Sequence, residues 1–385
     1  MKLRENNINK LDQQVFDVLI VGGGINGAVS VSSLASRGAT VAMIDRGDFS
    51  NFTSQESSNL VWGGIKYMET MEFGLVRKLC TARNHLIKAY PANIEEIRFF
   101  VTLEKGFRFN RFFMFCGGLL YWLIGNFFTR APRLLSRKRI SAEEPVVNVN
   151  NATGGFEYSD AFLRDNDARF VFKFIRSALD HGAIVANYVE SLGARREGDY
   201  WVTRARDVMD NRELTIKSKV IINACGPYVD EHNRLSGIET NHHHLFSKGI
   251  HLIVNAITPH KRVLTFFADD GRFFFSIPMG TKTCIGTTDT RVEQLPAVVT
   301  DEDRKFVLDN INKRLNLKQP LTTDDVIAER CGVRPLVVES NKNNKDQGDW
   351  TSLSRKHAIE TDQTAKVISI FGCKLTGCVN VGNEV

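Results

Sequence analysis

One short glycine-rich segment constrains the fold more than any other part of the chain. Gly22-Gly23-Gly24-Ile25-Asn26-Gly27 follows the apolar run VFDVLIV at 15–21 and precedes small and apolar residues at helical spacing up to Arg37. A glycine turn between a strand and a helix lets the backbone approach a pyrophosphate at the helix N-terminus. Because another apolar run, TVAMI, follows at 40–44, the sequence predicts a βαβ unit in a parallel sheet.

Asp45 adds to this signal. It ends the second predicted strand, 23 residues after Gly22, where a carboxylate accepts hydrogen bonds from ribose hydroxyls. The two features together predict an adenine dinucleotide but do not separate NAD from FAD. Three later features favour FAD: the hydroxyl-rich run 53–59, the strand end at 223–226, and the strand end at 371–376, which opens a helix.

The remaining periodicity predicts a chain of mixed helices and strands. Helices are expected over 69–90 and 160–181, and the second has an apolar face of Ala168, Val171, Phe172, Ile175, Ala178 and Leu179. Strands are expected at 184–187, 200–204, 213–217, 220–224, 250–254, 263–267, 273–277, 283–286 and 367–371, with the pair 200–204 and 213–217 forming a hairpin.

This pattern predicts an α/β fold, α+β overall, in which a Rossmann-like FAD-binding domain carries an inserted substrate domain with a mixed or antiparallel sheet. The FAD-binding domain is expected in parts, over 15–95 and 151–230, with a return at 346–385. Residues 96–150 form a basic aromatic segment, and 231–345 form the substrate domain, to which 60–150 also contributes.

Composition excludes several classes of protein. Of the 385 residues, 43% are hydrophobic and 24% charged, which is typical of a folded protein. Seven scattered cysteines without a C-x-x-C pair argue against a disulfide framework or a zinc site, and three adjacent histidines, 242–244, cannot all face one ion from regular structure. We therefore expect no metal and a reducing, cytoplasmic compartment, and the polar N-terminus shows no export signal.

The net charge of +6 is concentrated in one segment, because residues 98–139 hold nine basic residues and one acidic residue. No nucleic-acid-reading module accompanies it, so we expect no nucleic-acid partner. The apolar stretch 112–128 inside it is interrupted by glycines and is shorter than the ~20 residues that a membrane-spanning helix needs. Two alternatives remain: an interfacial element on anionic lipid, or a buried helical hairpin that covers the flavin domain.

Ordered motifs along nearly the whole chain carry a resemblance to a known family. They are Gly22 to Ala28, Gly63-Gly64-Ile65-Lys66-Tyr67, Gly155 to Asp160, Lys248-Gly249-Ile250-His251, Ile285 to Asp289, Gly332-Val333-Arg334-Pro335-Leu336 and Lys374-Leu375-Thr376. The sequence resembles the FAD-dependent sn-glycerol-3-phosphate dehydrogenases of the aerobic, membrane-associated type. The resemblance implies hydride transfer from C2 of glycerol 3-phosphate to flavin N5, formation of dihydroxyacetone phosphate, and electron transfer to quinone at the cytoplasmic membrane face.

The resemblance also implies site residues. Substrate contacts are expected from Lys66, Tyr67, Arg334 and Arg355, and catalytic contacts from His251, Arg334 and Lys374. A phosphorylated alcohol requires fixed cations, and His251 is the candidate base because an ordinary imidazole titrates near neutrality. Arg334 has a second candidate role, stabilisation of the developing alkoxide. The structural alternatives are a satisfied core histidine for His251 and an ion pair for Arg334.

The cofactor contacts expected for FAD come from segments spread along the chain. They are Gly22, Gly24, Ile25, Asn26, Gly27, Asp45, Arg46, Thr53, Ser54, Ser57, Ser58, Trp62, Gly63, Val189, Ala224, Gly226, Thr288, Asp289, Gly372, Lys374, Leu375 and Thr376.

The chain departs from the family pattern at several positions. Trp62 and Lys66 stand where the family commonly has His and Arg, and Cys373 places a thiol beside the expected flavin edge. Family members usually continue past the position of Val385 into a helical domain. Two alternatives therefore stand beside the leading hypothesis: an FAD enzyme acting on another anionic hydroxy compound or amine, or passing electrons to oxygen, and a flavin-binding relative without turnover.

Overall fold

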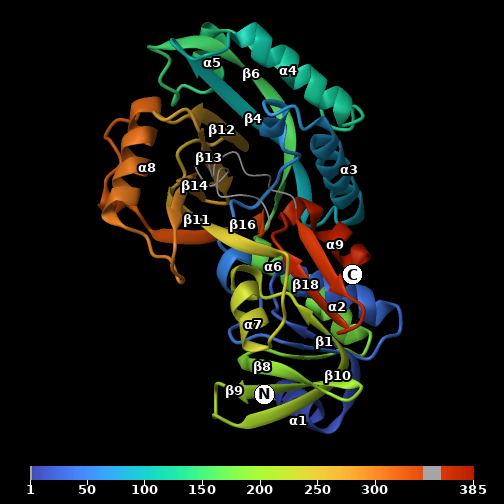
Figure 1. Ribbon diagram of the computed structural model, residues 1–385. Coiled ribbons are helices and arrows are strands. Elements are labelled where there is room, and N and C mark those ends of the chain that lie inside the picture. Colours follow the sequence, from blue (N-terminus) through green and yellow to red (C-terminus); the bar gives the residue numbers. More distant parts are fainter. Residues whose placement is uncertain (1, 341–356) are drawn as a thin grey trace.

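Two sheets organise the molecule in a computed structural model that describes residues 2–340 and 357–385. Figure 1 places the first sheet in the lower half, with β1 and β8–β10, and the second in the upper half, with β4, β6 and β12–β14. The first sheet is ordered β17-β18-β10-β1-β2-β7, with β9 and β8 added beyond β10. The second is ordered β15-β11-β14-β13-β12-β4-β6-β3, with β16 on β11 and β5 on β6.

The first sheet is parallel at its centre, as a βαβ unit requires. Its strands are β1 (Val15–Val21), β2 (Val41–Ile44), β7 (Ile184–Ala186), β8 (Val189–Glu197), β9 (Tyr200–Asp207), β10 (Glu213–Asn223), β17 (Ala358–Asp362) and β18 (Val367–Phe371). β1 pairs in parallel with β2 and β10, and β10 pairs in parallel with β18. The predicted hairpin is present, because β9 and β10 pair antiparallel.

The second sheet is mixed and lies between strands of the first in the chain order, as predicted. Its strands are β3 (Leu60–Val61), β4 (Ile94–Glu104), β5 (Arg133–Leu135), β6 (Ala152–Leu163), β11 (His242–Asn255), β12 (Arg262–Phe267), β13 (Phe273–Met279), β14 (Lys282–Gly286), β15 (Thr290–Val292) and β16 (Ala328–Glu339). β4 and β12 pair in parallel, whereas β11 pairs antiparallel with β16 over twelve residues. The division into domains stays a prediction, but 152–163, expected in the FAD-binding domain, belongs to this sheet.

Helices cover both faces of each sheet. They are α1 (Lys2–Gln13), α2 (Ile25–Ser36), α3 (Phe73–Ala89), α4 (Arg111–Ile124), α5 (Arg137–Glu143), α6 (Asp167–Asp180), α7 (Val229–Leu235), α8 (Asp301–Arg314) and α9 (Cys378–Glu384), with short 3-10 turns η1 (Phe52–Ser54), η2 (Ile65–Met68), η3 (Gly226–Tyr228), η4 (Thr323–Asp325) and η7 (Leu375–Gly377). Alternate strand residues face different cores, so Ile20 packs in the core under α2 and α6 while Leu19 packs in the core under α1. No helix in the described part of the chain combines the length and apolar character that a membrane crossing requires.

The helix predicted over 160–181 begins later than expected. Residues 160–163 complete β6, and α6 starts after Asn166, whose Oδ1 accepts a hydrogen bond from the Arg169 amide at 2.7 Å. The buried face is also shifted: Phe170, Val171, Phe174, Ile175 and Ala178 are buried, whereas Phe172 is 47% exposed. Periodicity alone could not separate the end of a buried strand from the start of a helix, because the apolar run 161–163 is too short to show either period.

A buried charge network braces the turn that leads into η2. The Arg83 guanidinium lies 2.7 Å from Asp160 Oδ1, with side chains 1% and 0% exposed. The Gly63 amide donates to Asp160 Oδ1 at 3.0 Å, and the Tyr121 hydroxyl donates to Oδ2 at 2.8 Å. Each oxygen of the buried Asp160 carboxylate therefore accepts at least one hydrogen bond, as a buried charge requires.

We expect Arg83→Met to lower the free energy of unfolding by about 3–5 kcal/mol, because it leaves the buried Asp160 carboxylate without its countercharge. Urea denaturation measures the change. The double variant Arg83→Met/Asp160→Asn is expected to recover part of the loss. The control is Arg169→Met, whose exposed ion pair with Asp165 at 3.5 Å is worth less than about 1 kcal/mol. Equal effects of Arg83→Met and Arg169→Met would contradict the network's role.

Candidate functional site

The glycine turn is required by a close meeting of three backbones. Gly22 has φ +107°, and a Cβ there would lie 2.5 Å from the carbonyl oxygen of Ala224 at the end of β10. A Cβ at Gly27 would lie 1.8 Å from the carbonyl oxygen of Gly22. Side chains at these positions would push α2 and β10 away from β1. The turn thus brings the N-terminus of α2 close to the ends of β1 and β10, and a helix N-terminus favours an anionic ligand.

Asp45 is held at the end of β2 by two backbone amides. Its Oδ2 accepts from Gly23 N–H at 2.6 Å and its Oδ1 accepts from Gly47 N–H at 2.8 Å. Burial raises the pKa of the Asp45 carboxyl above its usual value, although the two amides oppose the shift. Each oxygen keeps a second acceptor site, so the carboxylate remains able to bind ribose hydroxyls.

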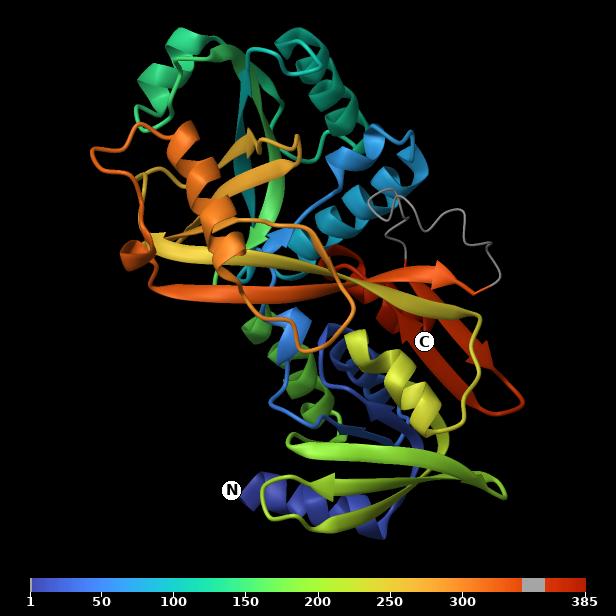
Figure 2. The ribbon, with the colours of Figure 1, turned by 60° about the vertical axis from the view of Figure 1, so that its left-hand side comes forward.

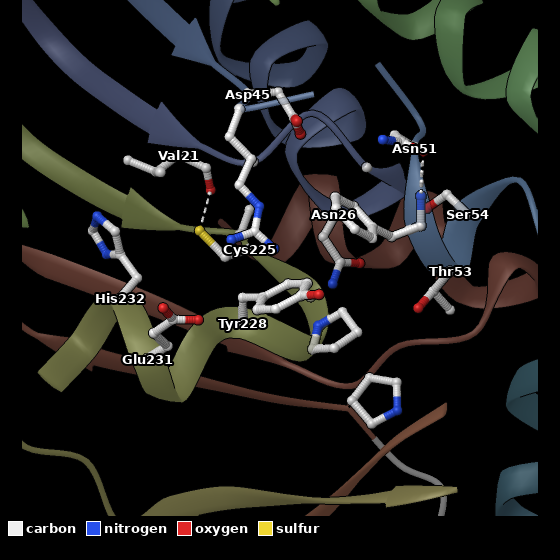
Figure 3. Close-up of a pocket in the computed structure, with 18 of the residues that line it drawn as sticks. Val21, Asn26, Asp45, Asn51, Thr53, Ser54, Cys225, Tyr228, Glu231 and His232 are labelled. Carbon is white, nitrogen blue, oxygen red and sulfur yellow. Dashed lines mark hydrogen bonds between the residues drawn. The ribbon is translucent and has the colours of Figure 1, made fainter. Parts of the chain in front are cut away.

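These elements line one cleft, which encloses about 1010 Å³ when the open solvent at its mouth is included. Figure 3 shows it between the end of β2, η1 and the start of α7. The predicted cofactor residues that line it are Gly22, Gly24, Ile25, Asn26, Asp45, Arg46, Thr53, Ser54, Val189, Ala224, Gly226 and Gly372. The buried Oδ1 of Asn26 has no hydrogen-bond partner within the described residues. A glycine cradle, a fixed carboxylate and a spare acceptor fit an adenine dinucleotide.

The cleft also contains Phe52, Tyr228, Glu231 and His232, which the sequence analysis missed, beside the predicted Arg46. Arg46 lies over the Tyr228 ring, with its guanidinium carbon 3.8 Å from the ring centroid, and 5.1 Å from the Phe52 centroid. Glu231 and His232 follow on the first turn of α7 and also line the cleft. Tyr228 lies two residues after Gly226, the last residue of the predicted strand end at 223–226, so its closeness to that segment was a usable signal. Nothing in the sequence marked Phe52.

Other predicted cofactor residues lie outside the lining of this cleft, and their roles stay predictions. They are Gly27, Ser57, Ser58, Trp62, Gly63, Thr288, Asp289, Lys374, Leu375 and Thr376. The structure gives some of them protein partners: Trp62 Nε1 donates to the Tyr158 hydroxyl at 3.2 Å, and the Thr376 hydroxyl donates to the Trp62 carbonyl at 3.0 Å. The 62–64 turn and the turn after β18 are therefore joined.

His251 lies on β11, directly across from Arg330 on β16. The residue is 4% exposed, and neither ring nitrogen has a hydrogen-bond partner in the described part of the chain. Burial, with the nearby Arg334 and Arg330, lowers the pKa of His251 to about 3. The imidazole is therefore neutral at pH 7. A satisfied core histidine, the structural alternative, is not what the described residues show.

Arg334 crosses the β11 backbone beside this histidine. Its guanidinium donates to the Thr287 hydroxyl at 3.1 Å and to the Thr288 carbonyl and Asp289 Oδ1, each at 3.3 Å. A Cβ at Gly249 would lie 2.2 Å from the guanidinium, so a side chain there would displace Arg334 from this position. The ion pair that formed the structural alternative is present. Arg334 nevertheless keeps 29% of its side chain exposed.

Lys374 contacts Tyr67 from the turn that follows β18. Its ammonium donates to the Tyr67 hydroxyl and lies 3.7 Å from the ring centroid. Lys66 is the neighbour of Tyr67 in η2. The preceding Cys373 has φ +94°, and burial raises the pKa of its thiol to about 12, so the thiol stays protonated. Arg355, the remaining predicted substrate residue, lies outside the described residues.

The low pKa of His251 predicts a stability change with pH. Below its ordinary value of 6.5 the unfolded chain binds a proton at this residue, whereas the folded chain does so only below about 3. Stability therefore falls as pH is lowered through this window, by up to about 1.4 kcal/mol per pH unit from this group. Urea denaturation of wild type and His251→Gln at several pH values measures it.

The variant is expected to lose less stability than wild type on acidification. His232, whose pKa burial lowers to about 4, is present in both proteins, so its contribution cancels. Identical pH slopes in the two proteins would show that His251 is not buried in the neutral form.

Known proteins are similar to this chain in sequence and in architecture. The aerobic glycerol-3-phosphate dehydrogenase of Staphylococcus aureus (strain USA300) is 29% identical over 99% of this chain and 68% of its own length. The solved glycerol-3-phosphate dehydrogenase from Bacillus halodurans complexed with FAD is 26% identical, with a TM-score of 0.77, over 100% of this chain and 66% of that one. This chain thus spans about two thirds of those proteins. Glycine oxidase from Geobacillus kaustophilus shares the fold, at 16% identity and TM-score 0.69, over 96% of this chain and 93% of that one.

A family model described as FAD dependent oxidoreductase matches residues 17–347. The matched range contains the glycine turn, Asp45 and the strands that carry His251 and Arg334. It confirms the predicted FAD cofactor and the α/β fold with an inserted sheet. The chain belongs to the DAO family of FAD-dependent oxidoreductases.

Proposed function

We propose that the chain oxidises sn-glycerol 3-phosphate at C2, giving dihydroxyacetone phosphate. The observation that carries the proposal is the buried, neutral His251 without a partner in the described residues, which lies across from Arg330 on β16 and near Arg334, farther along the same strand. A base beside fixed cations suits an alcohol that bears a phosphate. The relatives from S. aureus and B. halodurans are glycerol-3-phosphate dehydrogenases by name, which supports the same substrate.

The chain's own residues would hold the cofactor and the substrate. The glycine turn and Asp45 would bind the pyrophosphate and ribose of FAD, and Ser54, whose Oγ accepts from Ile25 N–H at 3.0 Å, keeps η1 against the turn. When bound, the flavin supplies the acceptor for a hydride. Arg334, with Lys374, Lys66, Tyr67 and Arg355, would bind the phosphate or the developing alkoxide.

His251 would take the hydroxyl proton on an unprotonated ring nitrogen as the C2–H bond breaks. Its pKa of about 3 is held down by burial and by Arg334 and Arg330. A phosphate dianion bound between these arginines would offset their charge and raise the basicity of the imidazole. Substrate binding would thereby prepare the base.

An aromatic cluster around Trp62 distinguishes this site from the family pattern. It is the reason to test the alternative functions. Trp62 packs on Phe273 and Tyr67, with ring centroids 6.0 and 6.4 Å apart. Trp62 stands where the family commonly has His. Lys66 offers a point charge where the family commonly has the bidentate guanidinium of Arg. The competing functions are oxidation of another anionic hydroxy compound or amine, transfer of electrons to oxygen in place of quinone, and flavin binding without turnover.

The proposed partners also include quinone and a lipid surface at the cytoplasmic face. Helix α4 packs on the second sheet, and Gly118 and Tyr121 are its buried residues. Its outer face exposes Phe112, Phe113, Leu119, Leu120 and Leu123. Many of the nearby basic residues are paired with carboxylates, including Arg98 with Glu157 and Arg130 with Glu96. The apolar face would therefore contribute more to lipid binding than free charge.

Addition of glycerol 3-phosphate to the anaerobic FAD-loaded protein is expected to bleach the visible flavin band, recorded by absorption spectroscopy. Glycerol is the control, because it lacks the phosphate that the arginines would bind. His251→Gln is expected to slow bleaching by about 10²–10⁴-fold. Bleaching only in Trp62→His/Lys66→Arg would show that the native substrate is a different compound.

The lipid surface has its own test. Phe113→Glu/Leu123→Glu is expected to weaken sedimentation with vesicles of mixed neutral and anionic phospholipid by at least about tenfold, because two apolar side chains no longer enter the bilayer interface. Met209→Glu is the matched control, since Met209 is 66% exposed in the turn before β10. Equal binding by both variants would exclude α4 as the contact.

A further inference from the structure

The three adjacent histidines lie at the start of β11 and join the two sheets. In Figure 2 the beginning of β11 (yellow) lies beside the red strands β17 and β18. His242 Nδ1 lies 2.6 Å from Glu360 Oε1 on β17, and His244 Nδ1 lies 3.0 Å from Asp230 Oδ2 on α7. The His244 side chain is fully buried, whereas that of Asp230 is 34% exposed. Each of these two histidines thus has its own carboxylate on the first sheet's side.

The protonation of His244 follows from its second contact. The Gly372 amide donates to His244 Nε2 at 3.2 Å. A backbone N–H can only donate, so Nε2 carries the lone pair and the proton is on Nδ1. That Nδ1–H donates to Asp230 Oδ2, which also accepts from the His244 amide at 3.1 Å. Asp230 therefore selects the tautomer that Gly372 requires.

Gly372 is the residue through which this contact reaches the cofactor cleft. It has φ +69°, and its carbonyl accepts from Asn26 Nδ2 at 3.0 Å. Gly372 and Cys373 both line the cleft, and Lys374 follows with its contact to Tyr67. The backbone N–H of Gly372 is therefore held by His244, and its carbonyl by Asn26, at the wall of the cleft.

We propose that His244, oriented by Asp230, is a positioning residue that fixes the Gly372–Lys374 turn against bound FAD. The inference rests on the proposed function only in placing FAD in this cleft. Without the Nε2 acceptor, the buried Gly372 N–H loses its partner, and an unpaired buried donor is costly. The turn then moves to find another acceptor.

The first test compares variants of the FAD-loaded full chain. His244→Phe keeps the ring that packs on Phe371, with centroids 5.2 Å apart, but removes the acceptor. It is expected to raise the Kd for FAD about tenfold and to shift the visible flavin spectrum. His244→Gln, which returns an acceptor near the Nε2 position, is expected to stay within about threefold of wild type. Flavin fluorescence released on dilution measures the Kd.

His242→Phe is the matched control, because it removes the other histidine–carboxylate contact between the sheets without touching Gly372. It is expected to bind FAD as wild type does, whatever its thermal stability. Equal weakening of FAD binding by His242→Phe and His244→Phe would overturn the proposal. It would show that both histidines only hold the two sheets together. Unchanged affinity and spectrum in His244→Phe would overturn it as well.

A second pair of variants tests the proposal even if His244→Phe does not fold. Asp230→Leu removes the acceptor that selects the tautomer, whereas Asp230→Asn keeps a carbonyl acceptor there. The leucine variant is expected to bind FAD about tenfold more weakly than the asparagine variant, and equal affinities would overturn the proposal. If glycerol 3-phosphate fails to bleach wild type while this order of affinities holds, the proposed substrate is wrong and the positioning role stands.

Discussion

The contact between the backbones of Gly22 and Ala224 is the constraint on which the cofactor site depends. β1 and β10 are adjacent parallel strands, and their carboxyl ends approach so closely that a single Cβ at Gly22 would lie 2.5 Å from a carbonyl oxygen. The same turn starts α2 and receives the Asp45 carboxylate through Gly23 N–H. Parallel strands bring their carboxyl ends to one edge of a sheet, and a ligand binds in the crevice there. The cleft is thus a consequence of sheet topology and of the missing side chains at Gly22 and Gly27.

The second sheet supplies chemistry that the first sheet lacks. β11 and β16 place His251 across from Arg330, and Arg334 crosses Gly249 toward Thr287 and Asp289. These charged groups are tolerable in a mostly buried setting because each guanidinium has fixed acceptors. The same logic applies behind the site, where Arg83, Tyr121 and the Gly63 amide satisfy Asp160. Buried polar groups with complete partners hold these walls still, whereas the ring nitrogens of His251 have no partner among the described residues.

Contacts between the sheets decide how the predicted cofactor and substrate residues face one another. The start of β11 is tied to β17 and α7 through His242 and His244, and the turn after β18 is tied to the 62–64 turn through Thr376. The aromatic Tyr67 lies under the Lys374 ammonium at this junction. Residues that are about 300 positions apart in the chain thereby become neighbours. Rigid connections of this kind are what a hydride transfer site needs, because small displacements of reacting groups are costly.

The sequence by itself determined the βαβ unit, the glycine turn, Asp45 and the inserted sheet, because each has a local signature: a steric requirement, a strand periodicity or a short motif. It did not determine that 160–163 is strand, that Phe172 faces solvent, or that Tyr228 and Arg46 stack in the cleft. Nor did it assign partners to the histidines at 242–244. Those features depend on which segments meet after folding, and tertiary structure alone decided them. A buried side chain can have its hydrogen-bond partner hundreds of residues away in the sequence, and a local sequence pattern contains no information about such a partner.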